Sequence, residues 1–89
     1  AAKRSQWAAH QAKKEGLATG FPDVMCIWAG GGICFIEFKT TAGRLSEAQG
    51  EWLVRLRERG HRVTVARSVD QAVEFLRECG APMLDAQPY

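Results

Sequence analysis

The stretch "GFPDVMCIWAGGGICFIEFKT", residues 20–40, decides the fold that we expect for this chain. Almost all of its residues are apolar, glycine or proline, which is typical of strands that lie inside a sheet. Three charged residues interrupt the stretch near its two ends: Asp23, Glu37 and Lys39. Charged side chains are seldom buried unless they are paired or functional, so the charge at these three positions needs an explanation.

Two apolar runs within this stretch predict a β-hairpin. Residues 24–28 and 33–39 are short and rich in β-branched and aromatic side chains, and "AGGG" at 29–32 separates them. Glycines supply the positive φ angles that tight turns between antiparallel strands need. Because side chains alternate along a strand, Glu37 and Lys39 are expected on the same face of the second strand.

The folded hairpin brings the three charged groups together at its open end. Antiparallel pairing about the glycines places Asp23 within about one register step of Glu37. Carboxylate oxygens suit a hard cation such as Mg²⁺ or Mn²⁺, and Lys39 can hold a phosphate oxygen or an attacking water. This set favours metal-assisted hydrolysis of a phosphodiester. The same residues also fit a structural role, with Glu37 and Lys39 as an ion pair at a strand end and Asp23 as a turn residue after Pro22.

The rest of the chain predicts helices that cover a small mixed sheet, in the order α-β-β-α-β-α. Helical spacing of apolar residues, with glycines after the last turn, indicates the helices, and a β-branched run indicates a third strand. In the last helix, Val69, Ala72 and Leu76 are expected on the inner face. The expected elements are a helix over 5–15, strands over 24–28 and 33–39, a helix over 45–60, a strand over 62–66, a helix over 68–79 and an irregular tail over 80–89.

Two of the predicted helices begin with the same capping pattern. Ser46 and Gln49 have the spacing of a capping box, in which each side chain binds a backbone N–H of the other residue. Ser68 and Gln71 repeat this spacing at the next helix. Gln49 therefore has a purely structural interpretation beside any functional one.

The composition is that of one globular domain, which we expect to cover residues 1–89. Hydrophobic residues make up 46% of the 89 residues and the formal net charge is +2, so neither disorder nor a strongly basic nucleic-acid binder is indicated. The three cysteines, Cys26, Cys34 and Cys79, lack zinc-site spacing and favour a reducing setting, cytoplasmic or inside a host cell rather than secreted. No apolar run is long enough to span a membrane.

Pro22-Asp23, followed by Glu37-Phe38-Lys39 after thirteen intervening residues, resembles the PD-(D/E)xK nuclease signature. The blocks "GFPDVM", "FIEFKTTAGRLSEAQGEWL" and "GHRVTVARSVDQAVEFL", in this order, are similar to the VRR-NUC family of that superfamily. The resemblance implies a restriction-endonuclease-like core of the α/β (α+β) class, with a β-hairpin that carries the acids and helices that flank the sheet.

The resemblance also implies roles for individual residues. Asp23, Glu37 and the backbone carbonyl of Phe38 would bind a divalent metal, Mg²⁺ or Mn²⁺. Lys39 would position the attacking water and stabilise charge on the phosphate. Gln49 would contact water or phosphate from the start of the following helix, so its capping and functional interpretations both stay open.

A DNA surface follows from the same resemblance. Lys3 and Arg4 resemble a basic segment near DNA, and Arg44, in the loop after Lys39, is the best candidate for a phosphate contact. Many members of the family also carry an acid on a helix ahead of this segment, whereas Glu15 is the only acid before Asp23 here. The chain is then a fragment, works without that acid, or uses Glu15 instead.

The function that we expect is a divalent-metal-dependent DNA endonuclease that cuts phosphodiester bonds. The resemblance implies branched DNA, such as four-way junctions, as the substrate, and a homodimer as the active species. The alternative is a nucleic-acid-binding module that keeps the fold but is catalytically incomplete.

Overall fold

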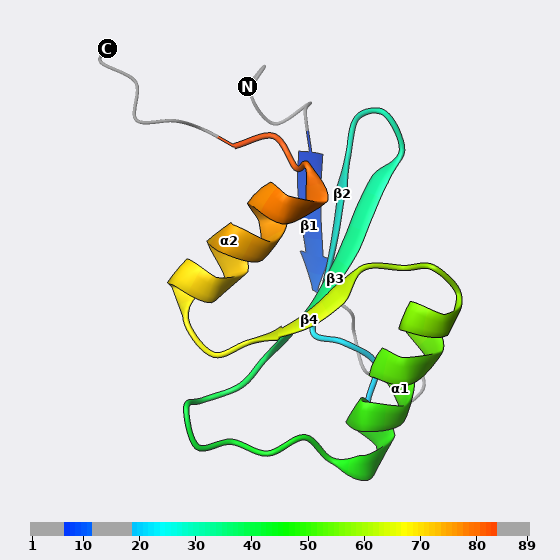
Figure 1. Cartoon of the computed structure of the whole chain (residues 1–89), viewed down its shortest axis with the longest axis vertical. Coiled ribbons are helices and arrows are strands. Elements are labelled where there is room, and N and C mark those ends of the chain that lie inside the picture. Colours follow the sequence, from blue (N-terminus) through cyan, green and yellow to red (C-terminus); the bar gives the residue numbers. More distant parts are fainter. Residues whose placement is uncertain (1–6, 12–18, 84–89) are drawn as a thin grey trace.

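A computed structural model describes residues 7–11 and 19–83 of the chain. Four strands form one sheet, and two helices pack against it in this part of the chain (Figure 1). The elements are β1 (Trp7–Gln11), β2 (Val24–Trp28), β3 (Gly32–Phe38), α1 (Glu47–Glu58), β4 (Val63–Ala66) and α2 (Val69–Cys79).

The sheet is mixed, with strand order β1-β2-β3-β4. β2 runs antiparallel to β1 and to β3, whereas β4 runs parallel to β3. A parallel neighbour needs a crossover connection, and α1 supplies it between β3 and β4. The mixed sheet flanked by helices confirms the expected fold class.

The hairpin of β2 and β3 is confirmed, and its turn has the expected chemistry. Gly30 and Gly31 have φ angles of +90° and +85°, a region in which residues with a side chain are strained. Beyond the turn, Trp28 pairs with Gly32, and a side chain at Gly32 would collide with the Trp28 ring. The glycine run therefore makes the turn and leaves room for the indole.

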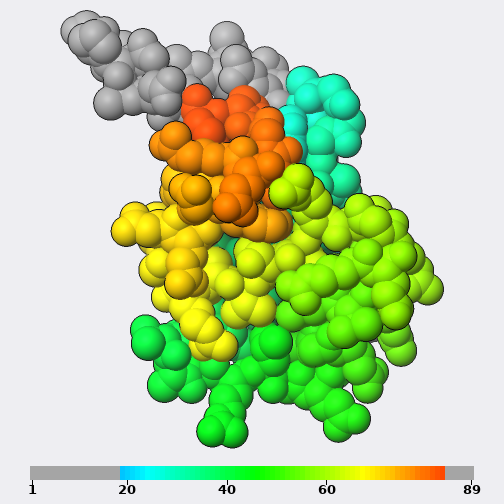
Figure 2. Space-filling view, in the orientation of Figure 1, coloured from blue at the N-terminus to red at the C-terminus, as the bar shows by residue number. Residues whose placement is uncertain are grey.

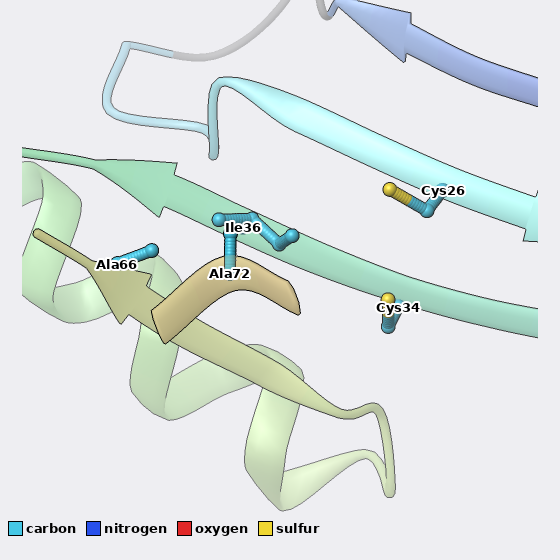
Figure 3. Packing of buried hydrophobic residues seen from close by; sticks show 5 residues of the cluster. All are labelled: Cys26, Cys34, Ile36, Ala66 and Ala72. Carbon is cyan, nitrogen blue, oxygen red and sulfur yellow. The ribbon is translucent and has the colours of Figure 1, made fainter. Parts of the chain in front are cut away.

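The face of the sheet under α2 holds a compact core of small side chains. Cys26, Cys34, Ile36, Ala66 and Ala72 are all buried there and pack together. Figure 3 shows Ile36 of β3 pointing toward Ala72 of α2, with the two cysteines on neighbouring strands. Both thiols are free.

The opposite face of the sheet packs against α1. Phe35 and Val63 of the sheet are buried against Leu53 and Leu56 of the helix. Alternation along β3 explains the two cores, because Phe35 and Ile36 must point to opposite faces. Glu37 follows Ile36 and so shares the α1 face.

Two expectations about the helices are wrong. Residues 7–11 of the expected first helix form strand β1, paired along its whole length with β2, and the rest of the 5–15 segment lies outside the described residues. Alanine and glutamine are good helix formers, but local propensity is a weak prior, and the backbone partners that β2 offers override it. Val69, which is expected on the inner face, is 76% exposed at the first position of α2.

In residues 7–11 and 19–83, neither helix has the length and apolar character that a bilayer crossing requires. Residues 81–83 after α2 have no regular secondary structure, as expected for the start of the tail, and Ala81 is buried.

Candidate active site

Asp23 and Glu37 face each other at the open end of the β2–β3 hairpin. Val24 pairs with Ile36 at this end, so the residue before Val24 lies opposite the residue after Ile36. The Asp23 Oδ2 atom accepts a hydrogen bond of 2.9 Å from the backbone N of Phe38. The hairpin thus brings the two acids together, as its glycine turn predicts, and Asp23 contacts the neighbouring strand instead of only ending a turn.

Glu37 is a buried carboxylate, with 2% of its surface exposed. It lies at the end of the apolar layer between β3 and α1. Gln49 of α1 donates a hydrogen bond of 3.1 Å from Nε2 to Glu37 Oε2. The acid is therefore fixed from the sheet by its strand and from the helix by one amide group.

The surroundings of Glu37 disfavour its negative charge. The pKa of its carboxyl group is raised from 4.5 to about 7. Burial is the largest cause, followed by the negative charge of Asp23 and a hydrogen bond between the two side chains, while the charge of Lys39 opposes the shift. Such a pair of acids either retains a proton or attracts a cation.

Lys39 follows directly after Phe38, the last residue of β3. Its backbone N donates to the carbonyl of Ala66 at 3.0 Å, so the residue is held against β4. The side chain is partly buried and acts electrostatically on Glu37. Among the described residues, however, the ion pairs within 4 Å do not include one between Glu37 and Lys39. The simple ion pair at a strand end is therefore not formed.

Gly20 brings the segment before Asp23 directly onto the start of α1. Its φ angle is +89°, and a Cβ atom there would lie 2.6 Å from the carbonyl carbon of Ala48 and 2.8 Å from the backbone N of Gln49. Contacts this short between a Cβ and backbone atoms require the chain to move apart. Only glycine therefore allows the loop with Asp23 and the helix with Gln49 to approach this closely.

An aromatic anchor holds the same segment from the other side. The ring of Phe21 packs edge-on against Phe35 at 5.7 Å and against Trp52 at 5.1 Å between centroids. Pro22 is fully buried beside it. Aromatic pairs of this kind favour one geometry, so Asp23 follows two residues that are fixed in the core.

The amide of Gln49 is oriented by the cap of α1. Its Oε1 atom accepts from the backbone N of Ser46 at 2.8 Å, and the Ser46 hydroxyl accepts from the backbone N of Gln49 at 3.1 Å. The capping box that the sequence predicts is complete. Because the cap engages the amide oxygen, the NH₂ group points to Glu37, so the capping role and the contact with the site coexist.

The start of α2 shows that a capping serine and glutamine do not by themselves bring the glutamine amide to an acid, as happens between Gln49 and Glu37. The Ser68 hydroxyl accepts from the backbone N of Gln71 at 3.1 Å, as in the first half of a capping box. The Gln71 Oε1 atom, however, accepts from the backbone N of Arg67 at 2.7 Å. The second helix therefore repeats the pattern only in part.

The expected DNA contacts are placed only in part. Arg44 is exposed in the loop between β3 and α1, and Figure 2 shows this green loop at the lower edge of the molecule. Lys3, Arg4 and Glu15 lie outside the described residues. Phe38 ends β3 with 44% of its surface exposed, directly between the buried acid and the lysine.

The donor set at this site fits a hard divalent cation. Within residues 7–11 and 19–83, no group of three or more His, Cys, Asp or Glu side chains is arranged to hold a metal. Mg²⁺ commonly binds proteins through only one or two carboxylates and keeps several waters. Asp23 and Glu37 supply that number, and their negative charge, which Lys39 offsets only in part, suits a cation.

Comparison with known proteins assigns the family. A model of the VRR-NUC domain matches residues 1–70 of the chain. A solved structure described as a VRR_NUC domain is 32% identical in sequence, covers 81% of this chain and 76% of its own, and superimposes with a TM-score of 0.67. No curated protein gives a significant match.

The chain therefore belongs to the VRR-NUC domain family and has a nuclease-type fold. This confirms the family that the sequence blocks around Asp23, Glu37 and Lys39 resemble. The matched region contains both acids, the lysine and Gln49.

Two residues to which the sequence analysis gave no structural role help to shape the site. Gly20 permits the close approach to α1, and Arg67 binds the loop after Lys39 through hydrogen bonds that span 24 to 27 residues. A glycine before an apolar anchor is a weak local signal for the first. No local signal exists for the second, because all its partners are distant in sequence.

The raised pKa of Glu37 predicts how the stability of the metal-free domain depends on pH. Between pH 4.5 and about 7 the folded chain keeps a proton that the unfolded chain has released, so stability falls as pH rises through this window. Glu37→Gln keeps an acceptor for Gln49 and removes the titration. The stability of Glu37→Gln relative to wild type should rise by on the order of 2 kcal/mol across the window, measured by urea unfolding in EDTA. Parallel pH curves for the two proteins would contradict this.

The close approach at Gly20 predicts opposite effects of the same substitution at two glycines. Gly20→Ala adds a Cβ at a positive φ angle and against backbone atoms, and should cost about 2 kcal/mol or more of unfolding free energy. Gly50→Ala, inside α1 with open space around its Cβ position, should instead stabilise by about 0.5–1 kcal/mol. Thermal unfolding of both variants tests this, and equal effects would show that Gly20 does not hold the segment against the helix.

Proposed function

We propose that this VRR-NUC domain is a divalent-metal-dependent endodeoxyribonuclease that hydrolyses phosphodiester bonds. The observation that carries the proposal is the pairing of Asp23 with a buried Glu37 whose pKa is raised to about 7. A buried acid beside a second acid lowers stability, and such arrangements concentrate at functional sites. The nuclease-type fold of the family supports the same reaction.

Mg²⁺ or Mn²⁺ is the cofactor that this donor set favours. Asp23 and Glu37 would supply one carboxylate oxygen each, and the carbonyl of Phe38, between Glu37 and Lys39 in the chain, is the third proposed ligand. A bound ion would supply positive charge that stabilises the phosphoryl oxygens and makes water more acidic. Without it, the two acids repel the phosphate of DNA.

Lys39 is the proposed catalytic residue beside the two acids, and Gln49 is proposed to position Glu37. An attacking water adds to phosphorus opposite the leaving oxygen and loses a proton, the bond to that oxygen breaks, and the leaving oxygen takes up a proton. The products are a phosphate monoester and a free hydroxyl group. Lys39, held at the strand end by its backbone bond to Ala66, places its ammonium to orient the water and stabilise charge on the phosphate. Gln49 holds Glu37 in one position through its amide, and this limits how the acid pair can move during the reaction.

DNA is the proposed substrate, with branched structures such as four-way junctions preferred and a homodimer as the active species. The exposed Arg44, in the loop between β3 and α1, suits a phosphate contact. The preference for junctions and the dimer follow from the family resemblance. A two-fold dimer would place two sites on one junction and widen a DNA surface that is small in a single domain.

The proposal predicts metal-dependent cleavage that requires Lys39. The purified chain should cut a labelled four-way junction in Mg²⁺ or Mn²⁺, not in EDTA, and should cut a linear duplex of the same sequence more slowly. Lys39→Ala should reduce the rate by about 100-fold or more, because it removes charge stabilisation in the transition state. Gel analysis of the labelled strands measures both effects.

A charge-matched control separates this site from the general basic surface. Arg77→Ala removes one positive charge from the last turn of α2, remote from the end of β3, and should leave the cleavage rate within about twofold, as expected for a weak surface charge. Equal losses in Lys39→Ala and Arg77→Ala would contradict the assignment of Lys39. Metal-dependent binding of the junction without cleavage would support the alternative, a catalytically incomplete DNA-binding module.

A further inference from the structure

The loop that leaves the active site after β3 is held by a single guanidinium group. Arg67 donates from Nη1 to the carbonyl oxygen of Gly43 at 2.6 Å and to that of Thr40 at 2.8 Å, with a longer contact of 3.4 Å to Thr41. Three backbone carbonyls of one short loop therefore converge on one nitrogen. Bonds from a charged donor are among the stronger hydrogen bonds in proteins.

The bound segment is a tight turn that lies beside the side chain of Lys39. The backbone N of Gly43 donates to the carbonyl of Thr40 at 3.1 Å, which closes a β-turn. At Gly43, the position that a Cβ would occupy lies 3.5 Å from Lys39 Cδ and 2.9 Å from Thr40 Oγ1. A side chain at residue 43 would therefore meet the aliphatic stem of the lysine, so the turn lies beside that stem and bounds one side of the space in which it can move.

Arg67 is itself fixed by the sheet and by α2. Phe38 pairs with Ala66 in the parallel ladder, so Lys39 and Arg67 leave the sheet next to each other. The backbone N of Arg67 donates to Gln71 Oε1 at 2.7 Å, which ties it to the first turn of α2. In Figure 2 the yellow segment at the start of α2 lies directly above the green loop.

We propose that Arg67 is a positioning residue of the nuclease site. Its guanidinium fixes the 40–43 turn, and this turn directs Lys39 toward Glu37. This inference rests on the proposed nuclease function. The role is distinct from contact with substrate, because the Nη1 group that makes these bonds is engaged by the loop itself.

The physical reason lies in the three converging carbonyls. With Arg67 present, their partial negative charges share one cationic donor. With Arg67 removed, Thr40 and Gly43 lose that donor and their oxygens are free to turn toward water, so the turn opens. A displaced Lys39 ammonium lowers the reaction rate, because misplacement of a catalytic group by about 1 Å can cost on the order of 100-fold.

The first experiment compares wild type with Arg67→Ala on the labelled junction. We expect kcat to fall about 10- to 100-fold with KM nearly unchanged. Methylguanidinium, added below denaturing concentrations, should restore a large part of the rate of Arg67→Ala and have no such effect on Lys39→Ala. No rescue of Arg67→Ala, or equal rescue of both variants, would overturn the proposal.

Salt dependence separates positioning from direct contact with DNA. A residue that binds phosphate reduces the slope of log affinity against log salt by about one when it is removed, and affinity falls with it. A positioning residue leaves this slope as in wild type. A slope reduced by about one in Arg67→Ala, with the 40–43 turn intact, would therefore overturn the proposal in favour of a phosphate contact.

A second variant covers the case in which Arg67→Ala does not fold. Arg67→Lys keeps the charge and most of the aliphatic stem, but its ammonium lacks the planar geometry of the guanidinium. We expect a folded protein with a reduced kcat that methylguanidinium does not restore, since the lysine still occupies the site. Full wild-type activity in Arg67→Lys would show that charge alone matters and would overturn the proposal.

Hydrogen exchange tests the positioning without any cleavage. The Gly43 amide, which donates within the turn, should exchange faster in Arg67→Ala and in Arg67→Lys than in wild type, as measured by NMR. Methylguanidinium should slow it again in Arg67→Ala. Unchanged exchange would overturn the proposal. If the wild-type chain cuts no DNA but the exchange result holds, the proposed nuclease function fails while the role of Arg67 in shaping the loop stands.

Discussion

The buried carboxylate of Glu37 is the constraint on which the rest of the site depends. Removing a charged group from water is costly unless it finds partners, and Glu37 is 2% exposed. One amide from Gln49 and the neighbouring Asp23 are what the fold places beside it. The close approach of α1 at Gly20 and the complete cap at Ser46 both serve to keep that amide within 3.1 Å of the acid.

The site therefore lies where three parts of the fold meet: the hairpin, the first turn of α1 and the end of the parallel β3–β4 pair. The hairpin supplies the acids, and the helix orients Glu37. Lys39 and Arg67 follow the paired last residues of β3 and β4, so they lie next to each other. Burial and the negative charge of Asp23 together raise the pKa of Glu37 to about 7, and a cation between the acids would offset both effects. The two acids therefore destabilise the metal-free domain, and the proposed metal ion would remove this destabilisation.

Local signals in the sequence explain what could be predicted. The glycine turn determines the β2–β3 register, and register alone brings Asp23 to Glu37; the capping pattern likewise determines how Gln49 starts its helix. Non-local contacts explain what could not. Residues 7–11 have little strand preference of their own and become β1 by pairing with β2. The contacts of Arg67 are with a loop more than twenty residues earlier, so no spacing in the sequence reveals them.

The most direct test of the central claim, that Asp23 and Glu37 form one metal site, is calorimetric titration with Mn²⁺ in two buffers of different ionisation enthalpy. Below the Glu37 pKa of about 7, the account predicts one Mn²⁺ bound per chain with release of most of one proton. Glu37→Gln should lose both the binding and the proton release. Binding of Mn²⁺ to wild type with no proton release, or unchanged binding to Glu37→Gln, would contradict it.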